Sequence, residues 1–412
     1  MEYTGQVNSP VVCGEVKLCV GEDALTLLTP LEVFSIPYVD IAAFGMEEYA
    51  LRIRTYAEAF TITKLGYDCE PFFGELYAAY NNQVRKALFV QGTPLVTAEG
   101  VYSYSESSKT ANGTSRIELY GDCVLLLPPD DGGRRIPLCF IAAVEQGDFS
   151  LTLRLLSGES YTFMRLGYET EPFTDGLTKQ LRTLLENAMK TARELDGSLS
   201  SVQAAAIAKL MPEGVAVPIG ALLSIAPSFV KALEAKIMES RSAESYQSLK
   251  AICDPKLICV GIKKDFAASE AEDAETPESD EQDETDAIAS EGEEDIAPDE
   301  YMVWMIAPGS NGNTAAVEFA VSPKESAATF VYRFNGGFEA FARDINRAVE
   351  AISFKREVIR LTDDELKKPE YAHYAMAIRR NDSLRLIRQS FAGRVIHSSP
   401  ENWKRRLLGY MM

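Results

Sequence analysis

Several features that would point to a particular chemistry are scarce or missing in this sequence. There are only two histidines, and the seven cysteines form no Cys-x-x-Cys pair, so neither a zinc site nor a disulfide framework is expected. No Gly-x-x-x-x-Gly-Lys-Ser/Thr or Gly-x-Gly-x-x-Gly motif occurs, so no nucleotide-binding loop is predicted. Ser398 and Ser399 follow His397, but a helix cap explains these serines better than a Ser-His-Asp relay does. We therefore expect no cofactor, no metal and no catalytic residues.

Long hydrophobic runs are also missing. The most apolar stretch, residues 215–230, is short and contains Pro218 and Pro227, so it predicts short packed helices rather than a membrane span. The opening residues, MEYTGQVNSP, are polar and lack the pattern of a secretory signal. We expect a cytoplasmic protein whose cysteines are reduced.

Basic residues are absent from one segment in particular. Residues 270–300 contain sixteen Asp or Glu and no Lys or Arg. The net charge of the chain is −20, so the remainder carries only −4. Residues 352–412, by contrast, contain thirteen Lys or Arg against seven Asp or Glu. A segment so rich in acidic residues cannot bury enough apolar surface to order itself, and we expect it to be a disordered arm.

The most informative feature that is present is a repeat. The sequence KLGYDCEPF ends at Phe72, and RLGYETEPF ends at Phe173. Around these motifs, Ile36-Pro37 and Ile41-Ala42-Ala43 recur one hundred residues later as Ile136-Pro137 and Ile141-Ala142-Ala143. A repeat of this length indicates two duplicated domains rather than a solenoid, whose period is about 20–50 residues.

The sequence pattern within each repeat predicts several strands followed by one helix. Residues 49–56, YALRIRTY, alternate between apolar and charged side chains, as in a strand with one buried face. The repeated motif then predicts the joint from the last strand to the helix: Gly66 and Gly167 make the turn, and Pro71 and Pro172 take the first helical position. The helix faces are predicted by apolar residues at helical spacing. They are Phe72, Leu76, Tyr80 and Val84 in the first repeat, and Phe173, Leu177, Leu181 and Leu185 in the second.

Short antiparallel strands closed by one amphipathic C-terminal helix resemble the pleckstrin-homology-like superfamily, including its GRAM-type members. The resemblance implies tandem units of a rolled antiparallel sheet or barrel, an α+β fold. Members of this superfamily are mostly non-catalytic modules that bind phosphoinositides through basic loops, or bind proteins along the barrel. The first turn here, Gly21-Glu22-Asp23, is acidic, which departs from a lipid-binding loop.

The resulting domain prediction has five parts. The two clear units cover residues 12–90 and 113–190, and a helical connector covers 195–250. A divergent third unit of the same kind is predicted over 251–354, from patterns such as AAVEFAV and FEAFARDINRAVEAI, and the disordered acidic insert, 266–300, lies within it. A basic helical tail covers 355–412.

The candidate binding residues are basic side chains on the predicted sheets and turns. The favoured interpretation is a solvated strand face or turn, and the alternative is a surface for a protein partner or an anion. These residues are Arg52, Arg54, Lys64, Arg154 and Arg165, together with Arg134 and Arg135 after the turn at Asp130.

Three functions are considered. The favoured one is a non-catalytic scaffold that binds protein partners, with the acidic arm steering basic ones; in composition this is similar to histone chaperones. The second is a membrane adaptor that binds an anionic lipid headgroup through the sheet arginines. The third is an enzyme with a site between the helical connector and the third unit. Nucleic-acid binding is not expected, because the acidic arm would compete for any basic surface.

Overall fold

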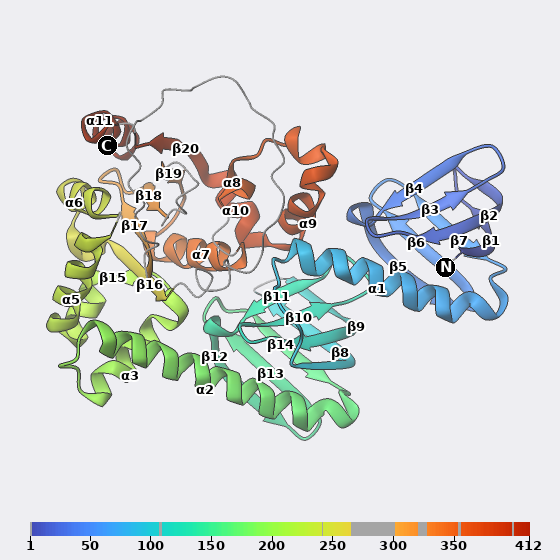
Figure 1. The fold of residues 1–412 in the computed structure, drawn as a ribbon, viewed down its shortest axis with the longest axis horizontal. Helices are drawn as coiled ribbons and strands as arrows, with labels where there is room; N and C mark the ends of the chain where they lie inside the picture. Colours follow the sequence, from blue (N-terminus) through green and yellow to red (C-terminus); the bar gives the residue numbers. More distant parts are fainter. Residues whose placement is uncertain are drawn as a thin grey trace. The chain divides into compact units, whose positions relative to one another are not determined.

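The computed structural model describes residues 2–106, 109–240, 242–264, 301–319, 328–352, 356–397 and 399–412. The fold is α+β, with three antiparallel sheets and helices between and after them (Figure 1). The chain divides into two compact units. The first contains Met1–Thr183 and Arg343–Phe391, and the second contains Leu184–Ala342 and Ala392–Met412. The predicted acidic insert, 266–300, lies outside the described residues.

The first sheet has seven strands in the order β4-β3-β2-β1-β7-β6-β5. The first strand, β1, pairs with β2 on one side and with β7 on the other. The helix α1 (Cys69–Ala87) follows the last strand and buries Phe72, Leu76, Tyr80 and Val84, as predicted. We call these elements the first repeat. Its strands are β1 (Glu2–Asn8), β2 (Cys13–Val20), β3 (Ala24–Leu28), β4 (Val33–Pro37), β5 (Ile41–Glu47), β6 (Ala50–Thr55) and β7 (Ala59–Thr63).

The second sheet has the same design, in the order β11-β10-β9-β8-β14-β13-β12. Its helix α2 (Thr170–Leu195) fully buries Phe173 and Leu177, but Leu181 and Leu185 are only half-buried, so the predicted apolar face is correct for its first two turns. These elements form the second repeat. Its strands are β8 (Val96–Glu106), β9 (Lys109–Leu119), β10 (Cys123–Leu127), β11 (Arg134–Pro137), β12 (Ile141–Gly147), β13 (Ser150–Leu155) and β14 (Ser160–Met164).

The predicted repeat boundaries begin too late. Units starting at residues 12 and 113 omit β1 altogether and leave out β8 and the start of β9. In β1 only Tyr3, Gly5 and Val7 are buried among polar neighbours, so its apolar pattern is weak. Both omitted strands lie next to the closing strand of their sheet, β7 or β14, and both are therefore essential to the fold.

The repeated motif forms the strand-to-helix joint, with one correction. Gly66 and Gly167 both adopt φ +61°, the left-handed conformation that favours glycine. Both helices begin before the proline, at Cys69 and Thr170, so Pro71 and Pro172 take the third helical position and not the predicted first one. The prolines still lie in the first turn, where backbone N–H groups have no partner within the helix, and no hydrogen bond is lost.

The second compact unit contains the connector helices and the third sheet. Its helices are α3 (Ser201–Leu210), α4 (Ile219–Ile225), α5 (Pro227–Glu239) and α6 (Ala243–Ile252). The six strands of the third sheet follow chain order, from β15 to β20. They are β15 (Val217–Pro218), β16 (Cys259–Lys264), β17 (Tyr301–Pro308), β18 (Thr314–Glu318), β19 (Ala328–Arg333) and β20 (Phe391–Ile396).

This third sheet differs from the first two. In the first two sheets the first strand, β1 or β8, lies between the second strand and the last strand of its repeat. Among the described strands of the third sheet, none takes such a position. Two of its strands, β15 and β20, lie outside the predicted third unit at 251–354. Residues 251–354 therefore do not repeat the strand order of the first two sheets.

The predicted tail, 355–412, is divided between the two units. Its elements are α8 (Glu357–Arg360), α9 (Ala372–Arg380), α10 (Asp382–Ser390), β20 and α11 (Pro400–Met411), and they follow α7 (Phe338–Ala351). Ser399, one of the two serines predicted to form a helix cap, caps α11 by accepting a hydrogen bond from the Asn402 N–H. None of the helices in the described ranges is long and apolar enough to cross a membrane.

Candidate functional site

The outer edge of the first sheet is occupied by a segment of the second repeat. The Phe44 N–H on β5 donates to the carbonyl of Pro129 at 2.8 Å, and the Asp131 N–H donates to the carbonyl of Ala42 at 2.9 Å. Ala43 and Asp130 form the antiparallel bridge between these bonds. The chain leaving β10 therefore adds a short extended segment to the edge strand β5.

Aromatic residues of α1 hold this segment in place. The hydroxyl of Tyr80 donates to the carbonyl of Asp130 at 2.7 Å, and the hydroxyl of Tyr77 donates to the carbonyl of Leu127. The ring of Phe44 lies 5.0 Å from that of Tyr80 and 5.9 Å from that of Tyr77. Main-chain pairing and aromatic packing together close this edge.

The equivalent edge of the second sheet, β12, is open. Val144 pairs with Leu153 on β13 as Phe44 pairs with Ile53 on β6, and both strands have the same irregularity after their first residue. By this register the Val144 N–H and the Ala142 carbonyl point away from β13. Within the described residues no strand pairs with their side of β12. Val144 is 36% exposed and Phe149, in the following turn, is 86% exposed.

A pair of aromatic residues is exposed at the same place in both repeats. Tyr67 and Tyr168, from the duplicated motif, are fully exposed, although the leucine and phenylalanine of the same motif are buried. Tyr49 and Phe149, in the turns after β5 and β12, are also exposed. Packing explains the rest of the motif but does not explain these tyrosines.

Two of the predicted basic residues lie beside these aromatic side chains. Lys64 and Arg165 are exposed and adopt φ +60° and +59° at the ends of β7 and β14. Continuing the strand registers places Lys64 opposite Tyr49 and Arg165 opposite Phe149. The structure thus brings together an aromatic residue, a basic residue and the motif tyrosine at one end of each sheet.

The other predicted basic residues do not join this surface. Arg54 is exposed on β6. Arg52 forms an ion pair with Glu47 at 3.4 Å, and Arg154 donates from Nε to Glu145 Oε1 at 2.7 Å. Arg134 and Arg135 lie on β11, at the opposite edge of the second sheet from β12. Because two of the sheet arginines are already paired with glutamates, less of their charge is available to a lipid headgroup.

His397 lies in a polar cluster of the second compact unit, with partners that the sequence did not predict. Its Nε2 is 3.2 Å from Glu318 Oε1 and 2.9 Å from Thr329 Oγ1. The indole N–H of Trp403 also donates to Thr329 Oγ1, at 2.8 Å. A nucleophile–base–acid relay uses both ring nitrogens of the histidine, whereas here Nε2 makes both contacts. The cluster joins α11 to β18 and β19.

Burial makes several thiols unreactive. It raises the pKa of Cys123 and of Cys259 to about 12, and that of Cys253 to about 11. A thiol with so high a pKa stays protonated near neutral pH and is a poor nucleophile. These cysteines act as small packing residues.

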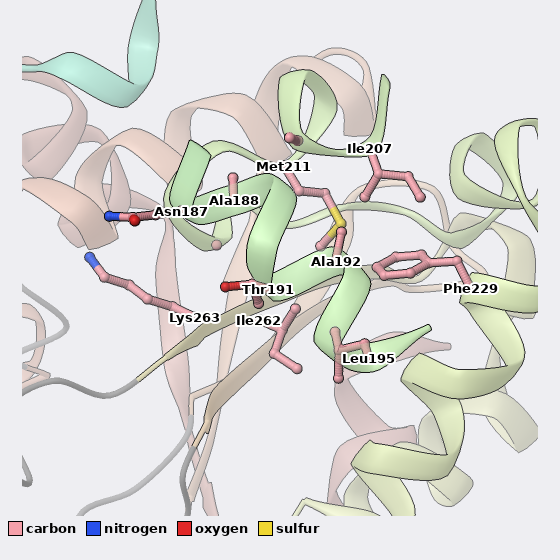
Figure 2. A pocket seen from close by; sticks show the side chains of 12 residues that line it. Asn187, Ala188, Thr191, Ala192, Leu195, Ile207, Met211, Phe229, Ile262 and Lys263 are labelled. Carbon is pink, nitrogen blue, oxygen red and sulfur yellow. The ribbon is translucent and has the colours of Figure 1, made fainter. Parts of the chain in front are cut away.

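A hollow lies in the second compact unit, between the connector helices and the third sheet (Figure 2). Its volume is about 40 Å³. Most of its lining is apolar, including Ala192, Leu195, Ile207 and Phe229, and the side chains of Asn187 and Lys263 lie at one side. Such a hollow has the character of a packing gap between helices rather than that of a substrate site. Within the described ranges, no three His, Cys, Asp or Glu side chains are grouped so that they could hold a metal ion.

Comparison with known proteins does not identify a related family. No protein-family model matches the sequence, and no curated protein matches it. The function is therefore argued from the site alone.

Proposed function

We propose that this chain is a non-catalytic scaffold built on two pleckstrin-homology-like units, and that it binds an extended segment of a protein partner at the edge strand β12. Two features support the family: both sheets have the same seven-strand order, and a C-terminal helix follows each one. The enzyme alternative is less well supported, because the hollow between connector and third sheet is small and mainly apolar.

One observation carries the binding proposal. The first repeat already pairs its β5 edge with the extended segment at Pro129–Asp131 through two main-chain hydrogen bonds. The second repeat has the same strand and register, but no strand in the described part of the chain pairs with its edge. An exposed edge strand presents unpaired N–H and C=O groups to any extended chain, and adding a strand to such an edge is a common mode of peptide recognition.

The charge distribution indicates which partners approach. Sixteen acidic residues in positions 270–300 make this segment strongly negative. A segment of this charge attracts basic proteins and speeds their encounter at low ionic strength. The partner is therefore a protein with a basic, extended region, which the acidic segment steers and the β12 edge binds.

Val144→Pro tests the main-chain part of the proposal. Proline removes the outward N–H of Val144 and also fixes φ at this residue, and edge strands tolerate proline where the N–H faces solvent. Tagged full-length chain is used to capture partners from cells, and the affinity of each partner is then measured with purified protein. We expect Val144→Pro to abolish capture and the control Val144→Ala, which keeps the N–H, to retain it.

Equal capture by the proline and alanine variants would show that main-chain pairing at β12 is not used.

Deleting residues 270–300 tests separately whether the acidic segment steers partners. The deletion is expected to slow association and to weaken its salt dependence, with little change in dissociation. Partners whose association is unaffected by the deletion would rule steering out.

The membrane-adaptor alternative remains a prediction with its own test. Liposome flotation of the parent and of a variant with Arg52, Arg54, Arg154 and Arg165 replaced by glutamine distinguishes it from protein binding. Flotation that depends on these arginines would favour the lipid function. No flotation of the parent would remove it.

A further inference from the structure

Four arginines line one pocket of the first compact unit. Arg134 and Arg135 come from β11, Arg347 comes from α7, and Arg380 comes from the end of α9. The pocket has a volume of about 30 Å³, and a cavity of about 10–15 Å³ already holds one water molecule. Positive charges that converge in a partly buried space repel one another unless anions balance them.

Two of the four arginines are balanced by carboxylates of the protein. Arg135 donates from Nη2 to Asp122 and from Nη1 to the carbonyl of Glu350, the latter at 2.6 Å. Arg347 Nη2 lies 2.5 Å from Glu159 Oε2. The carboxylate of Glu350 also lies near Arg135, with Oε1 3.7 Å from Nη2.

The other two arginines form no ion pair with any described carboxylate. The guanidinium of Arg134 lies over the ring of Tyr104, 4.1 Å from its centroid. Arg380, only 5% exposed, donates from Nη2 to the hydroxyl of Tyr80 at 2.6 Å. Its Nε has no hydrogen-bond partner among the described groups. Burying an incompletely satisfied guanidinium is costly, unless a ligand supplies the missing acceptor.

A further carboxylate, Asp130, forms no ion pair with either arginine among the described groups. It interacts electrostatically with Arg134 and Arg380, and burial raises the pKa of its carboxyl group. Asp382, which lines the pocket, already pairs with Lys109 and Arg385.

The surrounding backbone favours negative charge. A Cβ at Gly133 would lie 3.0 Å from Val84 Cγ1 and 3.3 Å from Arg380 Nε, so glycine at this position lets the turn approach the guanidinium closely. The helix α10 begins at the pocket, where Asn381 caps it by accepting from the Leu384 N–H at 2.9 Å. The first turn of a helix carries partial positive charge and attracts anions.

We propose that this pocket binds a phosphate-class oxyanion, either free phosphate or the phosphoryl group of a larger molecule, through Arg134 and Arg380. Arginine suits this ligand because its planar guanidinium matches phosphate oxygens in charge and geometry. The site is separate from the β12 edge and does not depend on the scaffold proposal.

Calorimetric titration of the full-length chain tests this inference. Inorganic phosphate and glycerol phosphate are the soluble probes, and phosphatidylcholine vesicles with and without phosphatidylinositol phosphate are the membrane probe. Arg380→Met and Arg134→Met keep the apolar stem and remove the charge, and Arg182→Met, at an exposed position on α2, is the matched control. We expect each pocket variant to weaken binding by about tenfold or more, and the control to change it little.

The probes also distinguish the source of the oxyanion. Binding of either soluble probe identifies a soluble anion, whereas binding only to phosphoinositide vesicles identifies a headgroup; both support the site if they depend on Arg134 and Arg380. Thermal unfolding checks that the variants are folded, and Arg134→Met, at a half-buried position, serves if Arg380→Met does not fold. No binding of any probe at millimolar concentration, or equal losses in the control, would overturn the proposal.

Discussion

The edge strands β5 and β12 have closely related sequences and the same register, but their surroundings are opposite. Both begin with Ile-Ala-Ala and shift register after the isoleucine. In the first repeat the outward groups of the strand are paired with Pro129 and Asp131, whereas in the second they are open. The local sequence thus determines the strand and its pairing on one side, but residues far along the chain determine whether its other side is closed.

The largest expected effect comes from removing the aromatic side chain at the closed edge. Phe44→Ala should lower the free energy of unfolding by about 3–5 kcal/mol, because the ring is buried against α1. Val144→Ala, at the equivalent open position, should change it by about 0.5 kcal/mol or less. Denaturant unfolding of the two variants measures the difference. Similar losses at both positions would mean that β12 is covered in solution.

A second pair of variants tests a feature that the two repeats share, the glycine at the joint between the last strand and the helix. Gly66→Ala and Gly167→Ala should each lower stability by about 1 kcal/mol, because both positions have φ +61°. A Cβ would meet no atom within 4 Å at either position, so the cost is conformational only. Thermal or denaturant unfolding checks this. Clearly unequal costs would indicate that the two joints differ in conformation.

The stability of the chain is expected to depend on pH through Glu159, in the turn before β14. Burial raises the pKa of Glu159, although Arg347 is its ion-pair partner. The folded chain then holds this proton more tightly than the unfolded chain, so stability falls as the pH rises through the raised pKa. Glu159→Gln removes this loss, and its stability relative to the parent should rise as the pH increases above the ordinary glutamate pKa of about 4.

Unfolding at several pH values measures this effect. The titratable groups that act on Glu159 are Arg347 from α7, Arg134 from β11, Glu106 from β8 and Tyr161 from β14. Glu58→Gln is the matched control, since Glu58 takes the same turn position in the first repeat. Parallel pH profiles for the parent and Glu159→Gln would contradict the prediction.

The smallest effect is expected at the exposed motif tyrosines. Tyr67→Ala and Tyr168→Ala should leave stability within about 0.5 kcal/mol of the parent, because both side chains are fully exposed. Leu65→Ala, at a buried position of the same motif, should cost several times more and serves as the control. A substantial loss in the tyrosine variants would show that these rings pack against part of the chain.

Much of the repeat architecture could be predicted from the sequence, because it depends on local patterns. Alternation in β6 and helical spacing in α1 reflect burial on one face, and Phe72, Leu76 and Tyr80 are buried as predicted. The polar strand β1 could not be predicted, because its place is set by pairing with β2 and β7 rather than by its own few apolar residues. The same holds for the chain order of the third sheet.

The candidate sites were less predictable, because they depend on contacts between distant residues. The charge of Lys64 and Arg165 marks them as candidates, and Tyr67 and Tyr168 follow them in the same motif, but the positions of Tyr49 and Phe149 opposite them depend on strand pairing. Arg134 and Arg135 were named as an anion site, yet their companions Arg347 and Arg380 lie more than two hundred residues later. The state of an edge strand is likewise invisible in its own sequence, as Ile41-Ala42-Ala43 and Ile141-Ala142-Ala143 demonstrate.

Amide hydrogen exchange at Val144 and Phe44 tests the central claim most directly. In the free chain we expect the Val144 N–H to exchange rapidly and the Phe44 N–H to exchange slowly, because within the described residues only the latter is hydrogen-bonded. On addition of the captured partner, Val144 should become protected while Phe44 is unchanged. A Val144 amide that is already protected in the free chain, or that gains no protection from the partner, would contradict the account.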